Sequence, residues 1–69
     1  MYVYELSYYD EDGATSIGLY TSMKKATQQL ADILTETNNH IVSIMQYTPN
    51  LWGYVCKEHA FDIHRRRVE

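Results

Sequence analysis

The chain has 69 residues and a formal net charge of −3, which suits one small domain over residues 1–69 and argues against a general nucleic-acid binder, since such proteins usually carry a basic surface. Its only cysteine, Cys56, excludes an intramolecular disulfide and indicates a reducing compartment. No apolar leader precedes the first predicted strand, so we expect a cytoplasmic protein with no membrane contact.

Two strands open the chain. Residues 2–9 alternate, with Tyr4 and Leu6 on one face, and residues 10–13 form a turn in which Gly13 supplies a positive φ. Residues 15–20 form the second strand, with Ile17 and Leu19 on one side. We expect these two strands to pair antiparallel.

Residues 22–37 have the helical period of the chain. Apolar side chains recur at steps of three and four residues and form one stripe, made of Met23, Ala26, Leu30, Ile33 and Leu34. Thr21 or Ser22 is the N-cap, and the asparagines that follow residue 37 end the helix. A helix of this length is marginal in water, so its stripe must pack on a sheet.

Three further strands follow the helix. Residues 40–47 are β-branched and apolar, which predicts a strand covered on much of both faces. After a turn at residues 48–50, residues 51–57 form a strand with Trp52, Tyr54 and Cys56 on one side. Residues 61–66 form the fifth strand, with Phe61 and Ile63 inward.

The order ββαβββ predicts an α+β fold, an antiparallel sheet of four to five strands with one helix packed on one face. One helix leaves the other sheet face partly bare, and the alternation places five aromatic residues there or near it: Tyr9, Tyr20, Tyr47, Trp52 and Tyr54. The predicted core is Tyr4, Leu6, Ile17, Leu19, Met23, Ala26, Leu30, Ile33, Leu34, Val42, Ile44, Val55, Phe61 and Ile63.

No residue pattern points to catalysis or to a cofactor. Cys56, His59 and His64 are zinc-binding residue types, but their predicted positions lie on opposite sides of one hairpin, so we interpret them as a buried thiol and surface imidazoles. Cys56 and His59 lack the third group that would orient a catalytic base. The three glycines are isolated, so no phosphate-binding loop is present.

The predicted aromatic face favours contact with a protein. It lacks the basic aromatic motif of RNA-binding sheets, whereas Trp and Tyr commonly anchor protein interfaces. A foreign partner and a homodimer both remain open. The run Arg65, Arg66 and Arg67 either contacts an acidic group or protects an edge strand as a solvated tail. The predicted partner-binding residues are Tyr9, Tyr20, Tyr47, Trp52, Tyr54, Arg65, Arg66 and Arg67.

The element order, with the Leu51-Trp52 pair, Tyr54, Lys57-Glu58 and a short closing strand, resembles the small phage-encoded anti-CRISPR proteins that inhibit type I-F systems. The resemblance implies a five-stranded sheet with one helix, no catalysis, and occupation of the surface of a host CRISPR complex where target DNA would bind. The acidic charge is a departure from that pattern. The segment Gly18 to Ser22 and its helix also resemble a family of uncharacterised small bacterial domains, which implies no function.

Two functional hypotheses follow. The first is a non-enzymatic viral inhibitor that binds a host protein complex in the host cytoplasm, with no cofactor, no metal and no direct contact with nucleic acid. The second is a small regulatory or structural cytoplasmic protein that associates with itself through the same face.

Overall fold

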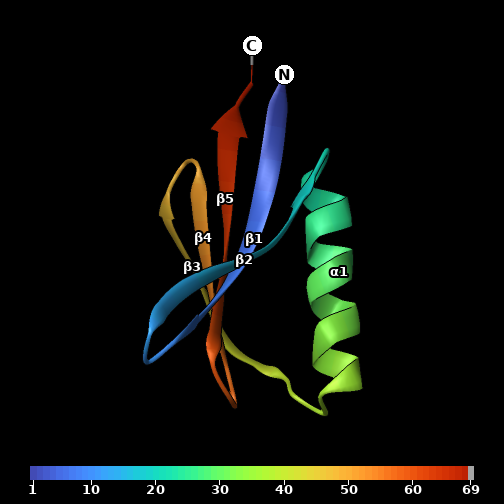
Figure 1. The fold of residues 1–69 in the computed structure, drawn as a ribbon, viewed down its shortest axis with the longest axis vertical. Coiled ribbons are helices and arrows are strands. Elements are labelled where there is room, and N and C mark those ends of the chain that lie inside the picture. The colour runs from blue at the N-terminus through green and yellow to red at the C-terminus, as the bar shows by residue number, and fades with distance from the viewer. Residues whose placement is uncertain (69) are drawn as a thin grey trace.

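The computed structural model describes residues 1–68, which form one sheet of five antiparallel strands and one helix in the order ββαβββ (Figure 1). The predicted α+β fold is therefore confirmed. The elements are β1 (Tyr2–Asp10), β2 (Gly13–Tyr20), α1 (Met23–Glu36), β3 (Ile41–Thr48), β4 (Leu51–Cys56) and β5 (Ala60–Arg67).

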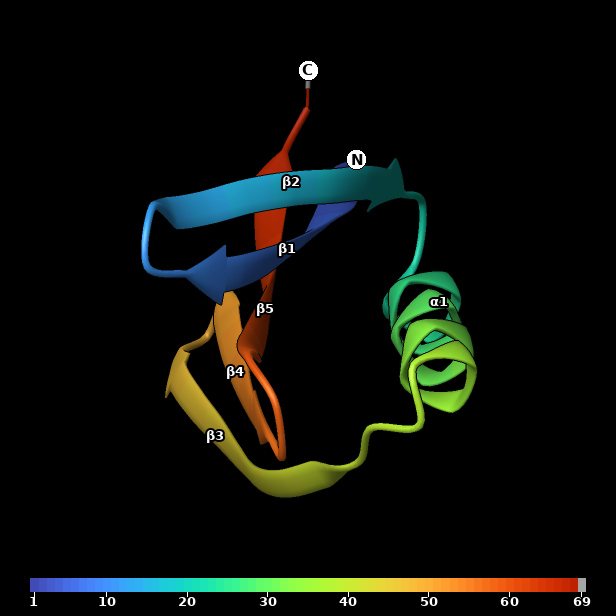
Figure 2. The ribbon, with the colours of Figure 1, turned by 60° about the horizontal axis from the view of Figure 1, so that its bottom comes forward.

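The strand order across the sheet is β2-β1-β5-β4-β3, so β2 and β3 are the two edge strands. The first and last strands lie side by side in the sheet, with Tyr2 opposite Arg67 and Leu6 opposite Ile63. The helix connects one edge strand to the other and lies on one side of the sheet, packed on β1 and β2 (Figure 2). On the opposite side of the sheet, called here the open face, residues 1–68 place no helix.

Local sequence explains where the helix begins and ends. Ser22 is the N-cap, because its Oγ accepts a hydrogen bond of 3.1 Å from the backbone N–H of Lys25. At the other end the N–H of Thr37 donates to the carbonyl of Ile33, and Asn38 adopts a positive φ of 52°. That backbone conformation stops the helix, as the asparagines in the sequence predicted.

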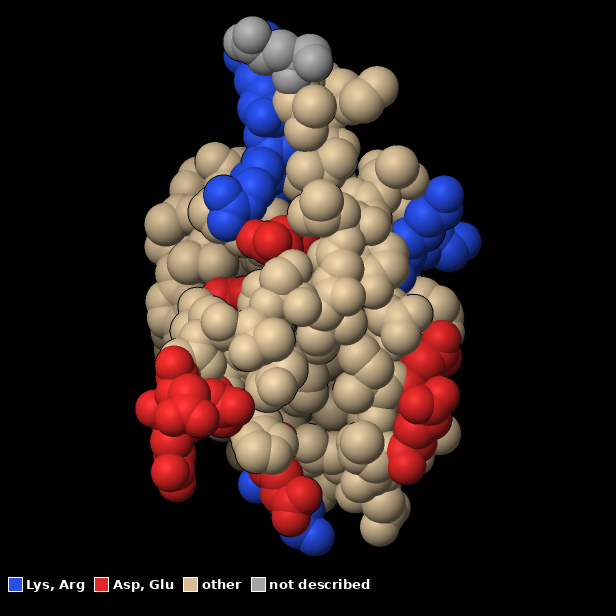
Figure 3. All heavy atoms as spheres, viewed as in Figure 1, with Lys and Arg blue, Asp and Glu red and all other residues tan. Residues whose placement is uncertain are grey.

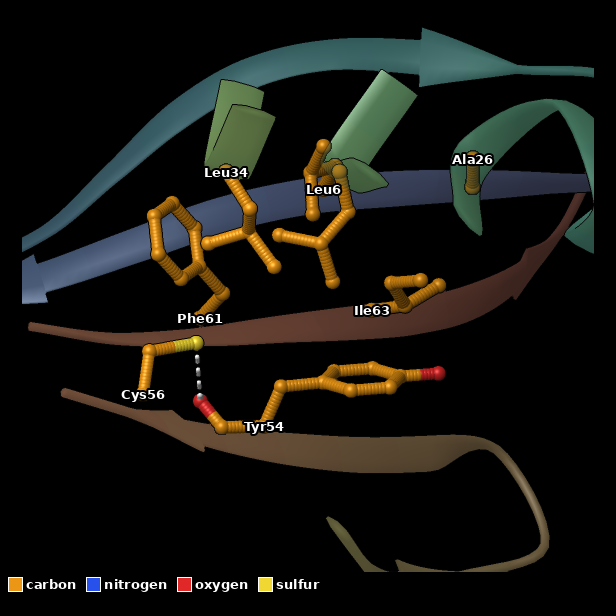
Figure 4. Packing of buried hydrophobic residues seen from close by; sticks show 8 residues of the cluster. Leu6, Ala26, Leu34, Tyr54, Cys56, Phe61 and Ile63 are labelled. Carbon is orange, nitrogen blue, oxygen red and sulfur yellow. Dashed lines mark hydrogen bonds between the residues drawn. The ribbon is translucent and has the colours of Figure 1, made fainter. Parts of the chain in front are cut away.

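The hydrophobic core lies between α1 and the middle of the sheet (Figure 4). Leu6, Leu30 and Ile63 are fully buried, and their side chains come from β1, α1 and β5. The other buried hydrophobic residues are Ala26, Leu34, Tyr54, Cys56 and Phe61. The apolar stripe predicted for the helix therefore packs as expected.

The predicted facing of β2 is wrong in its second half. The pairing shifts between Leu6 and Ser7 of β1, where Gly18 lies opposite Leu6 and Ser16 opposite Ser7. A bulge of this kind adds one residue to a strand and changes which side chains share a face. As a result Ile17 and Tyr20 both pack against the core, whereas Leu19 is 62% exposed.

The predicted facing of β4 is also wrong. Tyr54 lies opposite Phe61 and Trp52 lies opposite Ile63, and directly opposed residues project to the same side of a sheet. The even-numbered residues of β4 therefore face the helix with the core of β5. Val55 projects to the open face and is 48% exposed, although the sequence placed it in the core.

The prediction that the third strand is covered on both faces is wrong. Every residue from Ile41 to Thr48 is exposed, and Val42 and Ile44, predicted to be core residues, are 65% and 60% exposed. The physical reason is position, since β3 is the edge strand farthest from β2, and α1 packs on β1 and β2. The helix does not shield this edge.

Candidate functional site

The outer edge of β3 is exposed along the whole strand. One side of the strand pairs with β4, and within residues 1–68 no strand pairs with the other side. Its exposed apolar side chains are Ile41, Val42, Ile44, Met45 and Tyr47. They project to both faces of the sheet, because successive residues of a strand alternate.

Charge does not protect this edge. Residues 41–56, which comprise β3, its turn and β4, contain no Lys, Arg, Asp or Glu. Edge strands usually carry charges, proline or bulges that prevent pairing with another chain. Irregular pairing occurs in β3 between Ile41 and Ser43 and between Gln46 and Thr48, so residues 43–46 form the regular part of the exposed edge.

On the open face, next to β3, lies a pocket of about 250 Å³. Tyr47 reaches back from β3 and its ring lies over Gly53 of β4, where a Cβ atom would meet the ring. Because Gly53 has no side chain, the Tyr47 ring can occupy this position. The pocket is also lined by Tyr9, Leu51, Tyr54, Val55, Ala60, Phe61 and Asp62.

A hydrogen bond joins two of these pocket residues. The Tyr9 hydroxyl donates to Oδ2 of Asp62 over 2.7 Å, and Tyr9 comes from β1 while Asp62 comes from β5. This hydrogen bond, followed by desolvation and the negative charge of Asp62, raises the pKa of Tyr9 above its ordinary value. The contact holds the carboxylate of Asp62 in a defined orientation.

The arginine run alternates across the end of β5. Arg66 forms a salt bridge of 2.9 Å with Glu5 on the open face. Arg65 lies on the helix side, where its Nε donates to Oδ1 of Asn50 over 2.9 Å and its guanidinium lies 4.8 Å from the centre of the Tyr2 ring. These two arginines already have partners within the chain.

In Figure 3 basic side chains gather where β5 ends and where the helix begins, and acidic side chains gather at the turn between β1 and β2 and along the helix. At the lower end of this view basic and acidic side chains lie side by side. The turn between β1 and β2 carries Asp10, Glu11 and Asp12. The acidic turn therefore lies at the opposite end of the β1–β5 pair from the arginine run.

The structure divides the aromatic residues predicted for one bare face. Tyr9 and Tyr47 line the pocket on the open face, as expected. Tyr54 is a core residue, and Tyr20 and Trp52 pack against that core, so these three lie on the helix side. The prediction that all five aromatic residues share one bare face is therefore wrong. That any of them contacts a partner stays a prediction.

Sequence reasoning missed the surface role of Val42, Ile44 and Met45 and the place of Asp62 in the pocket. One available signal was the length of the uncharged stretch, residues 41–56. An uncharged strand is ordinary in a sheet interior and unusual at an edge. The position of Asp62 beside Tyr9 had no comparable signal, because the two residues are far apart in sequence.

The backbone N–H of Cys56 donates to the carbonyl of His59 over 3.2 Å, but the thiol and the two imidazoles do not form a cluster that could hold a metal ion. Cys56 is buried on the helix side, and burial raises the pKa of its thiol. His64 lies opposite Glu5 on the open side of the sheet, and His59 occupies the turn before β5 with a φ of 67°. Among residues 1–68 no group of three His, Cys, Asp or Glu side chains is placed to hold a metal ion.

Comparison with known proteins found no match to a protein-family model, a curated protein or a solved structure. Within the described part of the chain, no helix has both the length and the apolar character needed to cross a membrane.

Proposed function

We propose that this protein is a non-enzymatic inhibitor that binds another protein through the edge strand β3. The observation that carries the proposal is the exposure of all eight residues of β3, an uncharged strand with large apolar side chains on both faces. Burying apolar surface is the main favourable term in protein association, about 25 cal/mol per Å² removed from water. A partner that covers this edge would bury side chains that the fold leaves in water.

The mode of binding follows from the backbone. The outer side of β3 presents N–H and C=O groups that are not used by the sheet, and an extended segment of a partner pairs with such an edge by main-chain hydrogen bonds. Ile44 projects to the helix side and Met45 to the open face, so a partner would contact apolar residues on both faces. Residues 43–46 provide the regular backbone for this pairing.

For the partner, we propose a host CRISPR effector complex, with the protein acting as a phage anti-CRISPR inhibitor in the host cytoplasm. The support is the resemblance of the ββαβββ order and of the short motifs in β4 to type I-F inhibitors. In this proposal the bound protein prevents target DNA from reaching the complex. It needs no cofactor and makes no direct contact with nucleic acid, in keeping with its net charge of −3.

Co-elution tests this proposal. The protein is mixed with a purified type I-F surveillance complex and analysed by size exclusion with light scattering. We expect wild-type protein to co-elute with the complex and Ile44→Lys to be lost from that peak, because a charge would have to be buried at the contact. Leu19→Lys is the matched control, since Leu19 is equally exposed but lies on β2 at the opposite edge.

Failure of wild-type protein to co-elute, together with no protection of phage in infected cells, would overturn the anti-CRISPR proposal. If Ile44→Lys and Leu19→Lys lose co-elution equally, β3 is not the contact surface. Either result can be interpreted without a folding defect, because both positions are exposed and substitutions at exposed positions usually change stability by less than about 0.5 kcal/mol.

Self-association is the second candidate, and the absence of charge on β3 favours it. Antiparallel pairing of two β3 edges about a two-fold axis would place each residue close to the axis near its own copy, which opposes association when that residue is charged. Residues 41–48 contain no charged side chain, so this penalty is absent. Sedimentation distinguishes the two candidates. A monomer at high concentration would rule out self-association, whereas a dimer that binds no CRISPR complex would rule out the inhibitor proposal.

A further inference from the structure

The open-face pocket surrounds a carboxylate that lacks a cation. Within residues 1–68 the only salt bridge is between Arg66 and Glu5, so no described Lys or Arg pairs with Asp62. The Tyr9 hydroxyl donates to one carboxylate oxygen, Oδ2. The other oxygen, Oδ1, accepts no hydrogen bond from the described residues.

Small neighbours leave room around this carboxylate. Asp62 lies on β5, and the residues directly opposite it are Ser7 on β1 and Gly53 on β4. Gly53 lines the pocket together with Asp62, and it has no side chain that could cover the carboxylate. The register that places a glycine opposite Asp62 therefore keeps this part of the open face free.

The remaining lining suits a long side chain that ends in a cation. Tyr9 and Tyr47 supply aromatic rings, whose faces attract cations, and Leu51 and Val55 supply apolar surface for an aliphatic stem. The nearby turn between β1 and β2 adds the charges of Asp10, Glu11 and Asp12, since Tyr9 directly precedes it. Local charge and shape are complementary to a basic side chain.

We propose that this pocket binds a lysine or arginine side chain of a partner protein, with the cation beside Asp62 and the Tyr9 and Tyr47 rings. The inference rests on the proposed function and adds the chemistry of one contact to it. An acidic side chain would be repelled by Asp62. A purely apolar side chain would remove the carboxylate from water without replacing its lost hydrogen bonds, which is costly.

The test is an NMR titration of the full-length protein with blocked single amino acids. The probes are the N-acetyl methylamides of lysine and arginine, and the controls are those of norleucine and glutamate. We expect the lysine and arginine probes to shift the backbone amide signals of Gly53 and Val55 and to bind about tenfold more tightly than norleucine. Added salt should weaken this binding, because the site is open to solvent.

Two variants with the same change in charge locate the effect. Asp62→Asn keeps the size of the side chain, and we expect about a tenfold loss of lysine-probe affinity. Asp12→Asn removes one negative charge from the exposed turn and should change the affinity less than twofold. The dispersion of the amide signals reports whether each variant is folded.

Equal binding of norleucine and lysine, or an unchanged affinity in Asp62→Asn, would overturn the inference. These outcomes do not test the proposed function, which is tested by binding of an intact partner complex to β3. Lysine-probe binding without any partner would leave the pocket assigned and reject the inhibitor. Co-elution that requires Ile44 while every probe fails would support the inhibitor and reject the pocket.

Discussion

Ile63 and Ile44 are the same residue type on the same side of the same sheet, yet one is 0% and the other 60% exposed. Ile63 lies on β5, opposite Leu6 and Trp52, and it faces the helix. Ile44 lies on β3 opposite the core residue Tyr54, so it projects to the helix side as well. The difference comes from strand order alone: β5 lies next to β1, on which α1 packs, and β3 lies at the far edge.

The largest expected contrast is in stability. We expect Ile63→Ala to lower the free energy of unfolding by about 3 kcal/mol, because it removes buried atoms and leaves a cavity. Ile44→Ala should change it by less than about 0.5 kcal/mol. Urea unfolding followed by circular dichroism measures both. If Ile63→Ala is too unstable to purify, Ile63→Val should still cost about 1 kcal/mol, and equal losses at both sites would contradict the burial described here.

The next contrast is the response to alkaline pH. Burial raises the pKa of the Cys56 thiol above its usual 9.0 and that of the Tyr54 hydroxyl above its usual 10.0. Each group therefore ionises more readily in the unfolded chain, so its contribution to stability is complete below the unfolded pKa and is lost as pH rises through the folded one.

We expect the free energy of unfolding to fall above about pH 9 and to fall further above about pH 10. Tyr54→Phe should flatten the second decline, since it removes the ionising hydroxyl from the core. Urea unfolding at a series of pH values from 7 to 11 would show this, and a flat profile for wild-type protein would contradict it.

A smaller effect distinguishes the two hydroxyl residues before the helix. Ser22→Ala should cost about 1 kcal/mol, because it removes the acceptor for the Lys25 N–H. Thr21→Ala is the matched control, since Thr21 Oγ1 accepts only from the exposed Lys25 side chain, and it should cost less than about 0.5 kcal/mol. Thermal unfolding compares the two. A larger loss in the Thr21 variant would place the cap one residue earlier.

The smallest effect is expected at the boundary between core and edge. In Gly53→Ala the added Cβ meets the Tyr47 ring, which belongs to an exposed and flexible side chain and can rotate away. We expect a change in stability below about 0.5 kcal/mol, with altered chemical shifts for Tyr47 in an NMR spectrum. A large loss of stability would mean that the ring position is needed for the fold.

Local patterns predicted the elements well. The helix expected over residues 22–37 spans Met23–Glu36, and all five strands occur near their expected bounds. These features depend on the helical period, the Ser22 cap and turn residues such as Gly13, which adopts a φ of 112°. Each acts over a few neighbouring residues, so sequence alone is enough.

Burial was harder to predict because it depends on contacts between distant residues. A single bulge in the β1–β2 pair exchanged the places of Leu19 and Tyr20. The strand order decided the exposure of β3, and no pattern within Ile41–Thr48 records that order. For the same reason the sequence pointed to Tyr9 and Tyr47 as surface tyrosines but not to Asp62 between them.

The adjacency of β1 and β5 has a consequence for how the chain reaches this structure. Two units can form locally, the β1–β2 hairpin and the β3–β4–β5 meander, but the core requires their union through the pairing of the first and last strands. Closing so long a loop makes this step slow. The uncharged β3 edge is therefore exposed to solvent both in the native structure and in the β3–β4–β5 meander before it pairs with β1. A partner that covers this edge would also suppress aggregation while the protein folds.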